Sequence, residues 1–282
     1  MPDYSIRSAT EDDLTILLSW AADEGWNPGL DDRSAFQAAD PSGFYVGCIG
    51  GTPVTGISAV KYGTDFGFIG FYICHPDHRG NGYGWKLWQH AMASLDERTV
   101  GLDGVVEQQA NYKTSGFEFA HRTIRQSGIS MVDTPMDPRL TTIGQGLFPS
   151  IRDYDLQIFR FPRVDFLKSW LDPMASSRRG FALVDDGEVK GYGTLRQCAE
   201  GFKIGPLFAD TADIADTLFR ALAGQVKGQV VFLDTPEPNT HAEELAERYE
   251  LSPEFETARM YKGKNPNLPL DRIYGVTSFE LG

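Results

Sequence analysis

The chain has 282 residues, of which 41% are hydrophobic and 23% charged, so it is long enough for one large or two ordinary globular domains. Its formal net charge of −13 disfavours nucleic-acid binding, because a negative surface repels phosphate backbones. Three widely spaced cysteines, with no C-x-x-C pair, argue against a disulfide framework, and no apolar run is long enough for a membrane span.

The N-terminal stretch MPDYSIRSATEDD has neither the basic region nor the apolar region of a signal peptide. Together with the sparse cysteines, this predicts a cytoplasmic protein. The acidic balance also favours cationic small molecules as ligands, although many acidic surfaces serve only solubility.

The first 129 residues alternate between strand and helix patterns. Thr10 is placed to cap a helix in which Leu14 and Leu17 belong to one apolar face. This alternation of strand and helix patterns predicts a mixed sheet with helices on both faces. The predicted elements are strand 4–9, helix 11–23, helix 31–40, hairpin 43–63, strand 66–74, helix 83–98, strand 99–105, helix 107–116 and strand 117–129.

Residues 130–150 contain three prolines and no sustained hydrophobic period, which predicts a linker or an irregular crossing segment. A second block, residues 151–282, repeats the later element order of the first, which suggests a diverged internal duplication. Its predicted elements are helix 164–173, hairpin 180–197, strand 201–208, helix 211–226, strand 228–236, helix 239–250 and strand 255–263.

A glycine-rich turn in the first block, RGNGYG, separates an apolar strand from an amphipathic helix. Unpaired N–H groups at a helix N-terminus bind anions, and glycines let a phosphate come close to them. The Walker pattern G-x-x-x-x-G-K-[ST] is absent from the sequence, and the glycines at 80, 82 and 84 do not have the G-x-G-x-x-G spacing of a dinucleotide site.

The string R-x-x-G-x-G, Arg79 to Gly84, resembles the coenzyme A pyrophosphate loop of the GCN5-related N-acetyltransferase (GNAT) superfamily. The later NYKTSGFEF, with Tyr112, Gly116 and Phe117, resembles that family's Y-x-x-x-G-F segment. A structural turn with incidental glycines is the alternative. The resemblance implies an α/β (α+β) fold of two tandem GNAT units, 1–129 and 151–282, each a mixed, mostly antiparallel sheet flanked by helices.

The resemblance also implies that the fourth and fifth strands separate, so that the pantetheine arm of acetyl-CoA pairs with the fourth strand. The glycine turn would then bind the pyrophosphate through main-chain N–H groups. No metal is expected, since His75 and His78 form an isolated H-x-x-H without a second ligand pair. The residues predicted to bind the coenzyme are Tyr72, Ile73, Cys74, Arg79, Gly80, Asn81, Gly82, Tyr83, Gly84 and Asn111.

In the family a tyrosine four residues before the Gly-Phe pair protonates the departing thiolate, which corresponds to Tyr112 here. A phenol, with a reference pKa near 10, is protonated at pH 7 and can act as a general acid; a merely packed tyrosine is the alternative. The fourth strand has no carboxylate to deprotonate the amine. Glu107, Asp103 and Glu24 are the candidates, each also readable as a surface acid, and a water chain without a single base is a further option.

The stretch DEGWNPG, Asp23 to Gly29, is expected to cover the acceptor side of the cleft. Trp26 would supply a flat apolar wall, Glu24 could hold an ammonium group, and Asp103 is a further substrate contact. An ordinary loop anchored by a tryptophan is equally consistent with this sequence.

The second block resembles a degenerate GNAT unit. Asp210 and Asp213 occupy the position of the glycine turn, and two carboxylates at a helix start would repel a pyrophosphate. This copy is therefore predicted not to bind coenzyme A, and to complete the acceptor pocket or to stabilise the pair.

The predicted function is N-acetyltransfer from acetyl-CoA to an amine of a small-molecule or peptide acceptor by direct attack. A non-catalytic acyl-CoA sensor is the main alternative, and an aminoacyl-tRNA-dependent transferase is disfavoured by the net charge of −13. We expect a monomer or homodimer, with neither nucleic acid nor a membrane as partner.

Overall fold

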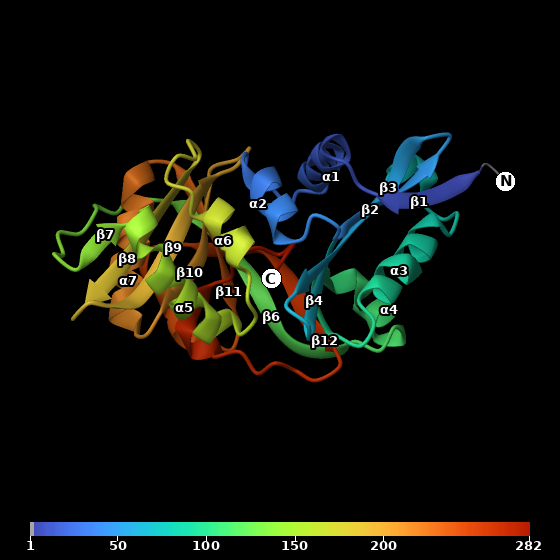
Figure 1. Cartoon of the computed structure of the whole chain (residues 1–282). Coiled ribbons are helices and arrows are strands. Elements are labelled where there is room, and N and C mark those ends of the chain that lie inside the picture. The colour runs from blue at the N-terminus through green and yellow to red at the C-terminus, as the bar shows by residue number, and fades with distance from the viewer. Residues whose placement is uncertain (1–2) are drawn as a thin grey trace.

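The computed structural model describes residues 3–282 and contains two halves with matching element orders (Figure 1). The first half comprises β1 (Tyr4–Ser8), α1 (Glu11–Asp23), α2 (Asp32–Ala39), β2 (Phe44–Ile49), β3 (Thr52–Tyr62), β4 (Phe66–Cys74), η1 (Pro76–His78), α3 (Tyr83–Ser94), β5 (Thr99–Val105), η2 (Val106–Gln108), α4 (Gln109–Thr114) and β6 (Glu118–Ile129).

The second half follows the same plan and adds a short strand near the C-terminus. It comprises β7 (Leu140–Thr142), η3 (Gln145–Leu147), α5 (Phe148–Phe159), α6 (Val164–Trp170), β8 (Arg178–Asp185), β9 (Glu188–Gln197), β10 (Phe202–Ala209), α7 (Ala212–Ala223), η4 (Gly224–Val226), β11 (Val230–Pro236), α8 (Thr240–Arg248), β12 (Ser252–Lys262), η5 (Leu270–Arg272) and β13 (Ile273–Gly275).

All strands form one continuous mixed sheet in the order β1-β2-β3-β4-β5-β12-β6-β11-β10-β9-β8-β7, with β13 paired to β10. Only the pairs β4–β5 and β10–β11 are parallel among the described residues. Helices flank the sheet, so the expected α/β class with mostly antiparallel strands is confirmed.

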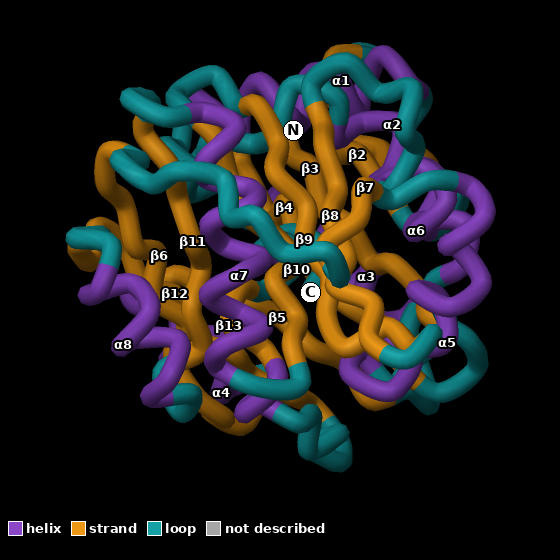
Figure 2. Tube along the Cα trace, turned by 90° about the vertical axis from the view of Figure 1, so that its left-hand side faces the viewer, coloured by secondary structure: helices purple, strands orange, loops and turns teal. Residues whose placement is uncertain are grey.

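The halves exchange their last long strands. β12 of the second half pairs with β5 of the first, β6 of the first half pairs with β11 of the second, and β6 and β12 pair with each other. In Figure 1 the green β6 and the red β12 cross the centre of the molecule, and Figure 2 shows β6, β11 and β12 next to one another. Each half therefore depends on the other for a central strand.

The hydrophobic core is also continuous across the halves. One cluster joins Phe36 and Phe71 of the first half to Trp170 and Phe279 of the second. The Phe36 and Trp170 rings stack at 6.1 Å between centroids. Burial of these large aromatic side chains, each worth a few kcal/mol, is shared between the two units.

Several local elements differ from the sequence-based expectation. The segment 130–150, expected as a linker, contains β7 and the first turn of α5, a helix that the hydrophobic pattern did not predict. Pro149 lies in the first turn of α5, where the missing proline N–H costs no hydrogen bond. The helix expected over 83–98 ends at Ser94. The stretch RIYGVTSFELG, which resembles the closing strand of tandem GNAT proteins, forms a strand only over Ile273–Gly275, as β13.

Candidate active site

The glycine-rich turn connects β4 to the N-terminus of α3. Gly80 and Gly82 have φ values of 79° and 76°, which a side chain rarely adopts, and a Cβ at either position would point into open space. The Asn81 amide donates hydrogen bonds to the carbonyls of His78 (3.1 Å) and Arg79 (3.2 Å), which fix the turn. Within residues 3–282 no side chain caps the first turn of α3, so its N–H groups remain available to an anion.

Strands β4 and β5 separate beside this turn. Their parallel pairing ends at Ile69 and Leu102, although β4 continues to Cys74. Phe71 has a φ of 47°, and the register between β3 and β4 shifts beside it, as in a β-bulge. The segment Gly70–Cys74 consequently presents an unpaired strand edge toward β5, where an amide-containing chain can pair.

A cavity of about 360 Å³ fills the space where the strands part. Both halves of the chain contribute to its wall. The lining residues are Glu24, Trp26, Ile69, Gly70, Phe71, Tyr72, Ile73, Cys74, Arg79, Gly84, Leu102, Asp103, Val105, Gln108, Tyr112, Phe255, Thr257, Phe279 and Glu280.

Tyr112, the predicted general acid, lies in this wall. Its ring packs against Trp88 at 5.5 Å and lies so close to Gly104 that a Cβ there would be 2.3 Å from the ring. Burial, with a smaller contribution from Tyr72, raises the pKa of Tyr112 well above that of a free phenol. The structure records no hydrogen bond of its hydroxyl to any described residue, so this group is free to donate to a ligand.

The residues predicted to bind the coenzyme fall into two sets. Tyr72, Ile73, Cys74, Arg79 and Gly84 reach the cavity wall, and burial raises the pKa of Tyr72 to about 12. The set outside the wall comprises Gly80, Asn81, Gly82 and Tyr83, which form the turn itself, and Asn111, whose amide donates to Gln108 Oε1 at 2.6 Å.

The three candidate carboxylates lie in different environments. Asp103 lines the cavity, but both of its oxygens accept hydrogen bonds from Arg259 at 2.7 and 2.6 Å. Glu24 lines the cavity and forms an ion pair with Arg79. Glu107 is exposed in η2 and does not belong to the wall.

Trp26 lines the cavity from the connection between α1 and α2, residues 24–31, which we call the acceptor loop. The second half and strand β6 together hold this loop in place. The Trp26 carbonyl accepts hydrogen bonds from Lys203 Nζ (2.7 Å) and Arg125 (3.2 Å), and Leu30 N donates to the Gln197 carbonyl at 2.9 Å. The predicted position of Trp26 over the cavity is thus set by tertiary contacts.

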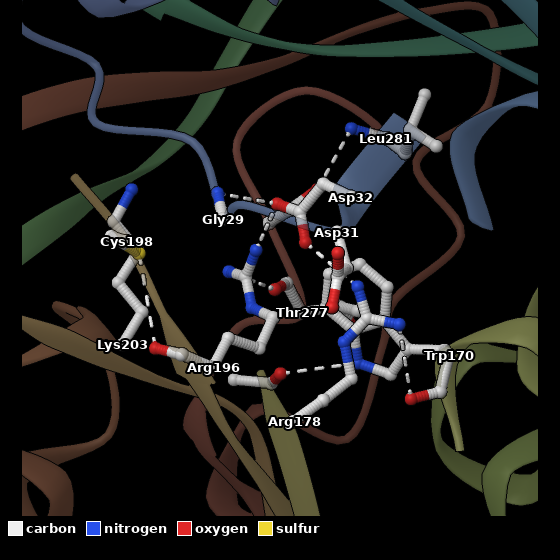
Figure 3. A network of polar contacts seen from close by, with 12 residues as sticks. Gly29, Asp31, Asp32, Trp170, Arg178, Arg196, Cys198, Lys203, Thr277 and Leu281 are labelled. Atoms are coloured by element: carbon white, nitrogen blue, oxygen red, sulfur yellow. Dashed lines mark hydrogen bonds and ion pairs between the residues drawn. The ribbon is translucent and has the colours of Figure 1, made fainter. Parts of the chain in front are cut away.

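A buried ion cluster anchors the end of the acceptor loop (Figure 3). Asp32, fully buried at the start of α2, pairs with Arg178 at 2.9 Å and with Arg196, and it accepts a hydrogen bond from Gly29 N at 2.8 Å. Both guanidinium groups lie 4.4 Å from the Trp170 ring. Because a buried carboxylate needs such partners, the loop is fixed to the second half.

Sequence reasoning did not identify the wall residues supplied by the second half. Phe255 and Thr257 come from β12, and Phe279 and Glu280 from the last seven residues, 276–282, which we call the tail. In the sequence, Phe255 and Phe279 resemble ordinary core residues, and Thr257 and Glu280 ordinary polar ones. No local signal in the sequence distinguishes them, because their place depends on the exchange of strands.

The corresponding gap in the second half is closed by the chain itself. Strands β10 and β11 pair only from Phe202 to Ile204, but β13 then pairs with β10, and Val276 N donates to the Asp234 carbonyl on β11 at 2.9 Å. A peptide segment therefore occupies the space that lies open between β4 and β5.

The start of α7 also differs from that of α3. The Thr211 hydroxyl accepts a hydrogen bond from Ile214 N, and Asp210 accepts hydrogen bonds from Tyr154 (2.9 Å) and Arg272 (2.5 Å). A side-chain cap and an internally paired carboxylate thus occupy this helix start, in keeping with the prediction that this copy binds no coenzyme A.

Over residues 3–282, no group of three His, Cys, Asp or Glu side chains is arranged to hold a metal ion. None of the helices in the same range combines the length and the apolar character needed to cross a membrane.

Comparison with known proteins agrees with this geometry. The Acetyltransferase (GNAT) family model matches residues 11–117, and an Acetyltransferase (GNAT) domain model matches residues 151–275. A holothin acyltransferase from Pseudoalteromonas sp. (strain SANK 73390) is 32% identical over 280 residues, which are 99% of this chain and 95% of that protein.

Solved structures show the same tandem architecture. A Pyrococcus horikoshii protein superimposes with a TM-score of 0.81 at 21% identity and covers 99% of this chain and 96% of its own. A tandem GNAT protein from the clavulanic acid biosynthesis pathway has a TM-score of 0.63 at 14% identity and covers 93% of this chain and 100% of its own. At these identities the likeness concerns the fold.

Proposed function

Because this chain belongs to the GNAT superfamily and is an acyltransferase, we propose that it transfers an acetyl or other short acyl group from acetyl-CoA to the amine of a small molecule. The observation that carries this proposal is the unpaired edge Gly70–Cys74. This edge lies between the glycine turn and the cavity, and the cavity wall includes Tyr112, whose hydroxyl has no partner among the described residues. The first half is the working unit.

The residues present fit coenzyme A. The N–H groups of the turn Gly80–Gly84 and the uncapped start of α3 would hold the pyrophosphate, and the backbone of Gly70–Cys74 would pair with the pantetheine amides. Arg79 Nε donates to the Cys74 carbonyl at 2.9 Å, which links the turn to the end of β4. The bound thioester would supply the activated acyl group.

Tyr112 would protonate the departing sulfur. Burial raises its pKa, so the phenol keeps its proton throughout the physiological range. A positioned acid of this kind contributes about 10²–10⁴-fold to a rate. The absence of a hydrogen-bonding partner for its hydroxyl among the described residues supports this role over a purely structural one.

The acceptor side of the cavity favours a compact amine with a flat apolar portion. Trp26, Phe255 and Phe279 supply aromatic surface, and Glu280 supplies a carboxylate that attracts a cationic group. In view of the net charge of −13, we propose no nucleic-acid partner.

Two measurements test the proposal. Isothermal titration with coenzyme A and acetyl-CoA should show one site per chain, because only one of the two gaps is open. A free-thiol assay over a panel of small amines, holothin included because a relative is named for it, should show amine-dependent thiol release. Acetyl-CoA binding without turnover on any amine would contradict the transferase proposal and support a sensor.

A further inference from the structure

The tail, residues 276–282, is a buried segment fixed from both halves. The Tyr62 hydroxyl of β3 donates to the Leu281 carbonyl at 2.9 Å, and Arg163 donates to Thr277 Oγ1 at 3.0 Å. β13, immediately before the tail, is held in the gap of the second half. The position of the tail is therefore a fixed feature of the fold.

The tail passes over β4 at Gly70, the first residue beyond the pairing of β4 with β5. A Cβ at Gly70 would be 2.1 Å from the carbonyl oxygen of Glu280, so only glycine allows this approach. Glu280 is 4% exposed and belongs to the cavity wall. The second half thereby brings a carboxylate to the place where the fourth strand of the first half has none.

Glu280 differs from the other buried carboxylates. Asp13, Asp32, Asp155 and Asp234 each form an ion pair with an arginine. No hydrogen bond or ion pair of the Glu280 carboxylate to a described residue is recorded. Burial of an unpaired carboxylate costs free energy, and such carboxylates cluster at functional sites. The position of Glu280 in the cavity wall is consistent with a functional role.

Another polar group of the cavity wall has no partner either. Thr257 on β12 is 2% exposed, lines the cavity, and its hydroxyl finds no partner among residues 3–282. The charged groups near Glu280 are already engaged: Arg125 pairs with Asp234, and Lys203 donates to the Trp26 carbonyl. Burial and then Arg125 lower the pKa of Lys203 to about 8, which Asp234 and Glu280 partly oppose.

We propose that Glu280 accepts the proton of the acceptor amine, so that the second half supplies the general base of the site in the first. This rests on the proposed function and names its missing catalytic residue. The other candidates are less suited: Arg259 occupies both oxygens of Asp103, Arg79 pairs with one oxygen of Glu24, and Glu107 lies outside the cavity.

The step balances without a further reactant. The amine nitrogen attacks the thioester carbonyl carbon, the C–N bond forms, and the nitrogen loses one proton to the Glu280 carboxylate, directly or through a water. The C–S bond breaks, and the sulfur leaves with its electron pair and takes the Tyr112 proton. Solvent returns a proton from Glu280 to Tyr112, so that thioester and amine become amide and thiol.

The test compares Glu280→Gln and Glu280→Asp with the wild type, with Glu254→Gln as a control because Glu254 is exposed on β12 and outside the cavity. Thiol release is measured from pH 7 to 9, and coenzyme A binding by titration. We expect Glu280→Gln to bind coenzyme A within twofold of the wild type and to lose about 100-fold in kcat at pH 7. The loss should shrink toward pH 9, where hydroxide can take the proton.

The two variants also distinguish a catalytic role of Glu280 from a role in packing alone. If Glu280 is the base, Asp keeps a carboxylate and is more active than the isosteric Gln; if Glu280 only packs, Gln is the better substitute. Gln activity within threefold of the wild type, a loss equal at every pH, or Gln exceeding Asp would each overturn the assignment while leaving the transferase proposal intact. A wild type that releases no thiol with any amine would overturn both.

Discussion

Arg259 on β12 and Asp103 on β5 form a bidentate ion pair, with Nε–Oδ1 and Nη2–Oδ2 distances of 2.7 and 2.6 Å. The Asp103 side chain is completely shielded from solvent, and that of Arg259 is 4% exposed. This pair joins the two halves directly beside the cavity. The ion pair connects β5 to β12, so Asp103 stabilises the exchange of strands between the halves. The expected contact of Asp103 with the substrate stays a prediction.

Removal of one partner of this pair should destabilise the whole protein. Asp103→Ala leaves the Arg259 charge buried without a counter-charge, which costs about 3–5 kcal/mol in the free energy of unfolding. Urea unfolding of the variant and the wild type measures this difference in the free energy of unfolding. Glu188→Gln, which removes the exposed pair with Lys190, is the control and should leave the midpoint unchanged. Similar losses in both variants would contradict the importance of burial.

A glutamate in the glycine turn should weaken coenzyme binding, whereas the same change in an unrelated turn should not. Gly82→Glu should raise the Kd for coenzyme A at least tenfold, because it adds like charge beside the pyrophosphate and strains a φ of 76°. Gly187→Glu is the matched control: its φ is 79°, it also faces open space, and it lies in the turn between β8 and β9. Titration of both variants should show weaker binding only for the first.

Tyr112→Phe should bind coenzyme A as well as the wild type and should lose about 100-fold in kcat. Because burial raises the pKa of Tyr112, its loss of a proton should not lower the wild-type rate below pH 9. Tyr249→Phe, far from the cavity wall, is the control. Normal turnover of the Tyr112→Phe protein from pH 6 to 9 would show that the phenol is not the acid.

Gly70→Ala should disturb the contact between β4 and the tail. The added methyl group would overlap the Glu280 carbonyl, and overpacking of this kind costs about 1–3 kcal/mol. We expect a lower urea midpoint together with slower thiol release. Gly146→Ala, where a Cβ meets open space, should change neither quantity. Full activity of the Gly70→Ala protein would mean that the tail can move without harm.

Asp13 should make stability depend on pH in the acidic range. A hydrogen bond from Arg7, reduced by burial but aided by Thr10, lowers the pKa of Asp13 from 3.8 to about 2. A carboxyl with a depressed pKa stabilises the fold above its unfolded pKa and loses that contribution as the pH falls from about 4 to about 2.

The Asp13→Asn protein should therefore be less stable than the wild type by about 1–2 kcal/mol at pH 6, and the difference should shrink at pH 3. Urea midpoints at the two pH values measure this difference. The neighbouring, exposed Asp12→Asn change is the control. A difference of equal size at both pH values would attribute the effect to helix capping alone.

The amino-acid sequence by itself determined the local features of the site. The glycine turn after an apolar strand, the helix that follows it and the tyrosine before Gly116-Phe117 are contiguous patterns, and backbone φ requirements and helix periodicity act over a few residues. The order of most strands and helices, and with it the fold class, followed from the same short-range physics.

Only the tertiary structure decided which strands became neighbours and which side chains completed the cavity. β6 and β12 have the same alternating pattern whether they pair within their own half or with the other, so the pattern cannot specify the exchange. Glu280 meets β4 more than 200 residues away in the chain, through a close backbone approach at Gly70 that leaves no local trace in the sequence. Long-range pairing of strand edges, which any strand sequence can satisfy, placed residues of the second half in the cavity wall of the first.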